Sequence, residues 1–178
     1  MAIYTKISAK EILSIEKKYN LGKIISFKGI KKGIENTNYL LNTKDKKFIL
    51  TIFEKRVHVK DLPFFMNLME KLNNFKINCP KPQRNKKGNF FFKIKNKTGS
   101  IVSFVEGKDK FKLNSKDCYY IGKNIAKLHK ISKKIKLFRK NSMSLKEWPI
   151  LLKKIGNKCR DLNPNLNILM KNSFLEIK

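Results

Sequence analysis

The fold of this chain is decided by residues 24–41, IISFKGIKKGIENTNYLL, and by residues 48–53, FILTIF, which follow a short polar loop. Apolar and β-branched residues dominate both stretches, as is typical of β-strands. Within the first stretch, Gly29 and Gly33 enclose a turn that contains two lysines. The pattern predicts strands at 24–30, 34–42 and 47–54, the first two of which form a hairpin.

Glycines beside a hairpin let backbone amide groups approach a phosphate closely. Gly29 and Gly33 are four residues apart, however, and the sequence contains neither a Walker A loop nor a Rossmann G-x-G-x-x-G fingerprint. Spacing alone therefore favours an ordinary surface hairpin, with a nucleotide-covering loop as the alternative.

The rest of the sequence predicts an α+β protein with the order helix, strands, helix, strands, helices. Ser8 and Glu11 have the spacing of a capping box for a helix that ends near Tyr19. Apolar residues at three- and four-residue spacing predict the later helices. The further elements expected are a helix after Asp61, strands at 90–94 and 100–105 joined by a turn at 96–99, and helices at 115–132, from Ser144 onward and at 165–178.

The formal net charge of +29 raises the possibility of nucleic-acid binding, because clustered cations release counterions from phosphate. The positive residues are almost all lysine, and they are spread along the whole chain. Arginine, which forms paired hydrogen bonds with phosphate and guanine, is scarce. The composition therefore argues against a nucleic-acid partner, and we expect the basic segment 130–140 to be a solvated helix end.

Several features predict a cytoplasmic protein without a membrane partner. No run approaches the roughly 20 apolar residues that a membrane-spanning helix needs. The first residues lack the apolar core of a signal peptide. Cys79, Cys118 and Cys159 lie far apart and include no Cys-x-x-Cys pair, which favours reduced thiols.

Ordered motifs over residues 2–130 resemble homoserine kinases of the aminoglycoside-phosphotransferase-like family. The matching motifs of the first part of the chain are residues 27–30, 33–39, 48–51 and 53–56. The most specific parts are the Glu-Asn-Thr-Asn turn at 35–38 with Phe-Ile-Leu-Thr at 48–51, and Leu128-His129 of the later helix. Supporting motifs occur in the family's order at residues 4–6, 61–65, 79–82, 104–107 and 121–129.

The resemblance implies a protein-kinase-like two-lobe fold with ATP between the lobes. The five-stranded antiparallel N-lobe would span residues 1–106, and 107–178 would begin a helical C-lobe. The implied reaction is transfer of the γ-phosphate of ATP to L-homoserine, with Mg²⁺, in threonine biosynthesis. The alternatives are another small-molecule kinase, similar to aminoglycoside or choline kinases, and a non-enzymatic basic protein that binds nucleic acid.

The resemblance also implies which residues bind the nucleotide: the hairpin would cover the phosphates, and a hinge strand would meet adenine. These residues are Gly29, Ile30, Gly33, Glu35, Asn36, Asn38, Thr51, Val102, Ser103 and Phe104. Leu50 is a further candidate for the adenine slot, although core packing is its simpler role.

Two departures from the kinase pattern limit what this chain could catalyse. Thr51 stands where the third strand of such lobes usually carries a phosphate-binding lysine. Lys55 and Arg56 are candidate replacements, with exposed strand-end charges as the simpler interpretation.

The second departure is the absence of the His-x-Asp-x-x-x-x-Asn loop, which supplies a catalytic carboxylate and a metal ligand. Neither His58 nor His129 is followed by x-Asp, and we expect His129 to be a packing residue. We therefore expect a C-terminally truncated chain, inactive alone, with no catalytic residue or metal ligand of its own. The Mg²⁺ ligands would lie in the missing segment.

Overall fold

The computed structural model describes residues 3–177 except 56, 143, 157 and 159–162. The chain forms two compact units, Met1–Phe138 and Arg139–Lys178. The first unit continues past residue 106, because it includes the helix that follows the sheet. The lobe limits expected from the resemblance stay a prediction.

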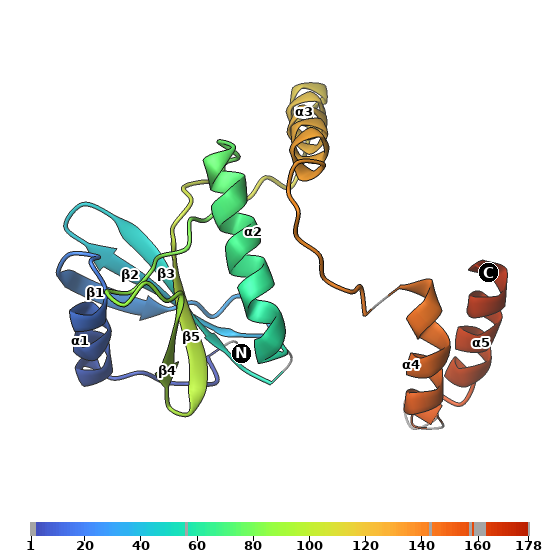
Figure 1. Cartoon of the computed structure of the whole chain (residues 1–178). Helices are drawn as coiled ribbons and strands as arrows, with labels where there is room; N and C mark the ends of the chain where they lie inside the picture. The colour runs from blue at the N-terminus through green and yellow to red at the C-terminus, as the bar shows by residue number, and fades with distance from the viewer. Residues whose placement is uncertain (1–2, 56, 143, 157, 159–162, 178) are drawn as a thin grey trace. The chain divides into compact units, whose positions relative to one another are not determined.

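The first unit is built on a five-stranded antiparallel sheet with the strand order β1-β2-β3-β5-β4 (Figure 1). The strands are β1 (Ile24–Gly29), β2 (Thr37–Thr43), β3 (Lys47–Phe53), β4 (Phe91–Ile94) and β5 (Lys97–Ser103). This sheet confirms the predicted α+β class and the number of strands. The predicted start of the second strand at residue 34 is wrong, because residues 30–36 form the loop between β1 and β2.

The turn between β4 and β5 contains only Lys95 and Asn96, so the turn predicted at residues 96–99 is wrong. Both residues have positive φ, 46° and 61°, as a tight two-residue hairpin turn requires. Gly99, which suggested a turn, lies inside β5. A Cβ atom there would lie 2.7 Å from Cζ of Phe92, so close packing across the strands explains this glycine.

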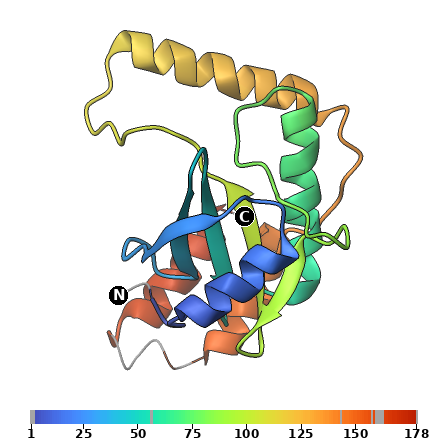
Figure 2. The same cartoon turned by 90° about the vertical axis from the view of Figure 1, so that its left-hand side faces the viewer.

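Two helices lie on opposite faces of the sheet (Figures 1 and 2). Helix α1 (Ala9–Lys18) begins with the predicted capping box: Glu11 N–H donates to Ser8 Oγ at 3.3 Å, and Ser8 N–H donates to Glu11 Oε2 at 2.7 Å. A 3-10 turn η1 (Val59–Asp61) leads into α2 (Leu62–Asn74), which lies on the other face.

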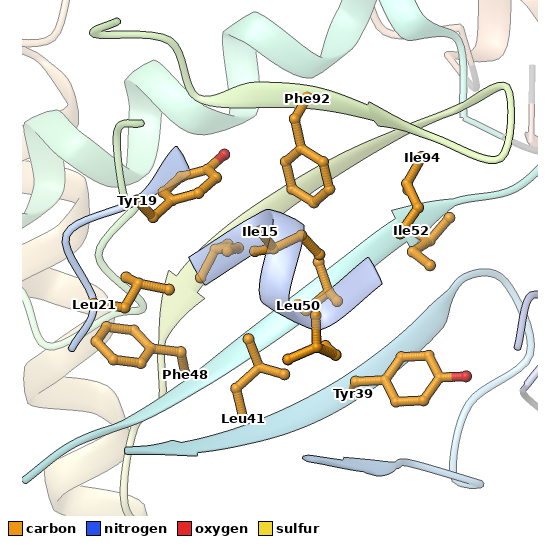
Figure 3. Packing of buried hydrophobic residues seen from close by; sticks show 12 residues of the cluster. Ile15, Tyr19, Leu21, Tyr39, Leu41, Phe48, Leu50, Ile52, Phe92 and Ile94 are labelled. Atoms are coloured by element: carbon orange, nitrogen blue, oxygen red, sulfur yellow. The ribbon is translucent and has the colours of Figure 1, made fainter. Parts of the chain in front are cut away.

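The hydrophobic core lies between α1 and the sheet (Figure 3). Ile12 and Ile15 of the helix pack against Leu41, Leu50 and Ile101, three strand residues with no exposed surface. Leu50 is therefore a core residue, which confirms its simpler predicted role.

Beyond β5 the chain is helical. Helix α3 (Ser115–Ser132) has the predicted limits and belongs to the first unit. The second unit contains η2 (Leu145–Glu147), α4 (Trp148–Ile155) and α5 (Leu166–Ile177). Among the described residues after Ile101 none is buried, and His129 is exposed rather than packed as expected.

Among all the residues that the structure describes, no helix has the length and apolar character needed to cross a membrane.

Candidate functional site

The sheet face opposite α1 presents one row of side chains across four strands. Lys28 pairs with Leu40, Leu40 with Ile49, and Ile49 with Val102. These four residues, which we call the open row, share a face because their neighbours along each strand point toward α1. Lys28 is exposed, and the three apolar members are half-buried. The row thus gives an apolar surface with a cation at one end.

A second row on the same face contains two of the predicted site residues. Asn38 pairs with Thr51, and Thr51 pairs with Ser100. Thr51 Oγ1 donates a hydrogen bond to Asn38 Oδ1 at 2.8 Å. The Thr51 hydroxyl is therefore occupied by its bond to Asn38. The side-chain NH2 group of Asn38 is then the group of this pair that can donate a hydrogen bond to a ligand.

The loop between β1 and β2 owes its shape to two glycines in different ways. Gly33 has a φ of 117°, in the region that favours glycine. At Gly29 a Cβ atom would clash with Ile3 Cδ1, so packing of the N-terminal segment explains that glycine. After β1, Ile30 N–H donates to the Asn38 carbonyl at 2.8 Å and extends the strand pairing into the loop.

A hollow of about 390 Å³ lies beside this loop, next to the open row. Its lining consists of Lys28, Gly29, Ile30, Lys31, Lys32 and Leu40. Three lysines around one hollow create a positive potential that favours an anionic ligand. Lys32 Nζ also forms an ion pair with Asp109 Oδ2, and the hydrogen bond to this carboxylate raises the pKa of Lys32. The pair connects the loop with the segment that follows β5.

The structure does not place Glu35 and Asn36 at this hollow. Asn36 Oδ1 accepts a hydrogen bond from the Glu54 amide at 3.3 Å, which fixes the end of the loop against β3. Glu35 lines a different hollow, together with Tyr4 and Glu54. Neither of these two predicted residues therefore belongs to the lining of the hollow beside the open row.

Glu54 is the centre of a polar network that the sequence did not reveal. Its Oε1 accepts hydrogen bonds from Thr5 Oγ1 and Thr37 Oγ1, both at 2.7 Å, and its Oε2 pairs with the Lys97 ammonium. Burial raises the pKa of Glu54, but the hydrogen bonds from Lys97, Thr5 and Thr37 outweigh it and lower the pKa below its ordinary value. The network ties the N-terminal segment to β2, β3 and β5.

The predicted hinge residues lie at the end of β5, yet two of their amides are already engaged. Ser103 N–H donates to the Lys81 carbonyl at 2.8 Å, and Phe104 N–H donates to the Lys47 carbonyl at 3.0 Å. Within the part of the chain that the structure describes, the amide of Val105 has no hydrogen-bond partner. The first available donor after β5 is therefore Val105, one residue beyond the predicted hinge.

Two residues are candidate replacements for the kinase lysine, Lys55 and Arg56. Lys55 is exposed, and Arg56 lies outside the described residues. Among the described residues, no group of three or more His, Cys, Asp or Glu side chains could hold a metal ion.

Sequence reasoning missed three members of the open row, namely Lys28, Leu40 and Ile49. The signal that could have found them is the two-residue alternation of a strand. Leu40 lies two residues after Asn38, and Ile49 lies two residues before Thr51.

Comparison with known proteins places the chain in a family. Residues 26–161 match the phosphotransferase enzyme family, APH. The chain belongs to this family. It is also 36% identical over 170 residues to a homoserine kinase of Bradyrhizobium sp. strain BTAi1, and 37% identical over 171 residues to a homoserine kinase of Nitrobacter winogradskyi. Each alignment covers 96% of this chain and 52% of the relative, so the chain spans about half the length of the curated relatives it matches.

Solved phosphotransferase structures confirm the predicted kinase-like fold. The crystal structure of spectinomycin phosphotransferase APH(9)-Ia, in complex with ADP and spectinomycin, matches with a TM-score of 0.61 and 16% identity. The match covers 86% of this chain and 48% of that protein. An AMP-bound complex of the same enzyme gives a TM-score of 0.57 over the same shares.

Proposed function

We propose that this chain is the nucleotide-binding half of a homoserine kinase, which transfers the γ-phosphate of ATP to the side-chain hydroxyl of L-homoserine. The observation that carries the proposal is the alignment of 96% of the chain with curated homoserine kinases at 36–37% identity. Such an enzyme acts in threonine biosynthesis, and the expected location is the cytoplasm.

The geometry of the open row supports ATP binding at this face. Leu40, Ile49 and Val102 offer a half-buried apolar surface on which an adenine ring can lie. The amide of Val105, which has no hydrogen-bond partner among the described residues, follows the same strand and provides a donor for the edge of the base. Lys28, at the other end of the row, lines the basic hollow where the phosphates would lie.

In this proposal the chain binds and orients ATP but does not activate the acceptor. Phosphoryl transfer needs a carboxylate that orients the attacking hydroxyl, and the sequence has no His-x-Asp motif. We assign that carboxylate, the Mg²⁺ ligands and the homoserine pocket to the second half of the enzyme. When bound, Mg²⁺ would neutralise negative charge on the phosphates.

A fusion protein tests the proposal. Residues 1–178 are joined to the second half of the Bradyrhizobium sp. BTAi1 homoserine kinase, and ATP consumption is measured with homoserine, choline or spectinomycin as acceptor. We expect phosphorylation of homoserine only, and none by the chain alone. Activity on choline or spectinomycin without activity on homoserine would refute the proposed substrate.

A pair of matched variants of the fusion protein tests the binding face. Leu40→Trp fills the open row and should raise the KM for ATP. Ile25→Trp introduces the same side chain at a β1 position that is 66% exposed and does not belong to the row, and it should leave this KM unchanged. Equal KM values for the two variants would place the nucleotide elsewhere.

A further inference from the structure

The N-terminal segment is bonded to the strand that follows the β1–β2 loop. We call residues 3–7 the N-terminal strap. The amides of Tyr4 and Thr5 both donate to Thr37 Oγ1, at 3.0 Å and 3.1 Å. Thr37 is the first residue of β2 and has no exposed surface. The strap is therefore fixed at the point where the loop enters β2.

Tyr39, two residues farther along β2, holds the second half of the strap. Its hydroxyl donates to the Thr5 carbonyl at 3.0 Å and accepts from the Ile7 amide at 3.2 Å. Figure 3 shows this hydroxyl pointing away from the apolar cluster. At the start of the strap, Ile3 packs against Gly29, the last residue of β1. The strap is thus held by the strands on both sides of the loop.

One side chain of the strap reaches the loop itself. Tyr4 Oη donates a hydrogen bond to the Ile34 carbonyl at 3.0 Å. Ile34 follows Gly33, whose φ of 117° gives the loop its turn. Because a peptide group is planar, holding this carbonyl fixes the whole group between Ile34 and Glu35. Tyr4 therefore fixes the loop immediately after its turning point.

The bond between Tyr4 and Ile34 lies at the surface. Tyr4 is 56% exposed, and Ile34 is 71% exposed. Neither residue belongs to the buried cluster or to the partly buried residues packed against it. A surface segment of this kind can open locally while the core stays folded. Loss of the bond should therefore release the loop and leave the sheet intact.

The first half of the same loop lines the basic hollow beside the open row. Ile30, Lys31 and Lys32 contribute to this lining, and Gly33 joins them to Ile34. A loop that is ordered before the ligand arrives binds it more tightly, because ordering a mobile segment on binding costs conformational entropy. Fixing Ile34 thus favours binding at the neighbouring residues.

We propose that Tyr4 is a positioning residue for the nucleotide. Its hydroxyl holds the β1–β2 loop in the conformation that meets the phosphates of ATP. Tyr4 is not one of the residues that line the basic hollow, so it acts through Ile34 rather than by contact with the nucleotide. The inference rests on the proposed function, because it requires ATP at this face of the sheet.

Nitrogen-15 relaxation of the 178-residue chain tests the anchor without any ligand. Tyr4→Phe removes the hydroxyl and keeps the ring. We expect lower amide order parameters at residues 33–36 and unchanged values in β3 and β5. Tyr119→Phe removes a hydroxyl at a 65% exposed position of α3 and should leave the loop unchanged. Equal order parameters for Tyr4→Phe and the parent chain would overturn the inference.

Calorimetric titration of the fusion protein tests the consequence for the nucleotide. Tyr4→Phe should weaken ATP binding about two- to fivefold, as loss of one exposed hydrogen bond does. Adenosine binding should stay the same, because the loop meets only the phosphates. Tyr119→Phe should change neither affinity. An equal loss of adenosine affinity would show general structural damage, and an unchanged ATP affinity would show that the bond does not position the loop; either result overturns the inference.

The outcomes separate this inference from the proposed function. A fusion protein that phosphorylates homoserine while Tyr4→Phe binds ATP normally would overturn the role of Tyr4 and leave the function intact. A selective loss of ATP affinity in a fusion protein inactive on homoserine would support Tyr4 and overturn the substrate. A fusion protein that binds no ATP would overturn both.

Discussion

At the scale of single residues, Glu54 shows how one carboxylate joins segments that are far apart in sequence. Its side chain is 8% exposed and accepts from two threonines and one lysine. Its lowered pKa means that the folded state holds the charged form more firmly than the unfolded chain does. The resulting stabilisation is fully present above the ordinary pKa of 4.5 and is lost as pH falls through the lower folded value.

We expect Glu54→Gln to lower the free energy of unfolding by about 1–3 kcal/mol at pH 7, because it weakens a partly buried charged network. The difference from the parent chain should shrink as pH falls below 4.5. Urea unfolding at several pH values measures both effects. Glu106→Gln, which removes an exposed ion pair with Lys47, should change stability by less than about 1 kcal/mol.

Lys28 offers a second test at this scale, since it is the cation at the end of the open row. In the fusion protein, Lys28→Met should weaken ATP binding by about three- to tenfold while adenosine binding stays the same, because only the phosphate contact is lost. Calorimetric titration compares the two ligands. Lys17→Met in α1, which removes one exposed charge away from the row, serves as the control. An equal effect on adenosine would contradict the assignment.

At the scale of elements, the β4–β5 hairpin depends on its two left-handed turn residues. Asn tolerates a φ of 61° better than a β-branched residue does. We expect Asn96→Val to destabilise the chain by about 1–2 kcal/mol and Asn96→Gly to be nearly neutral. Thermal unfolding of the two variants measures the difference. Equal stability would show that strain in this turn is relieved elsewhere.

At the scale of the whole molecule, the buried residues that the structure describes all belong to the first compact unit. The buried cluster extends from Ile12 to Ile101, and none of the described residues of the second compact unit belongs to it. Cutting the chain after Phe138 should therefore leave the cooperative unfolding of the first unit within a few degrees of its original Tm. Differential scanning calorimetry measures this. A large loss of stability would show that the second unit supports the sheet.

The sequence predicted local structure well where the signal lies within a few residues. The Ser8–Glu11 capping box and the helix at 115–132 are read from short-range spacing, and both occur as expected. The β4–β5 turn was misplaced because Gly99 is a turn signal that here serves packing against Phe92. Local patterns do not distinguish these two uses of glycine.

The candidate site depended more on long-range contacts. Asn38 and Thr51 were predicted separately, and strand register joined them through a hydrogen bond. The amides of Ser103 and Phe104 are engaged by carbonyls of distant segments, which no motif around the hinge could show.

By itself, the sequence determined the elements, the five-stranded α+β class and the family resemblance, because periodicity and ordered motifs are properties of the linear chain. Only the tertiary structure decided which side chains share the open row, which backbone amides at the end of β5 can still donate a hydrogen bond, and which apolar side chains of α3 are exposed. The physical reason is that register, burial and hydrogen-bond partners are set by segments that meet only when the sheet forms.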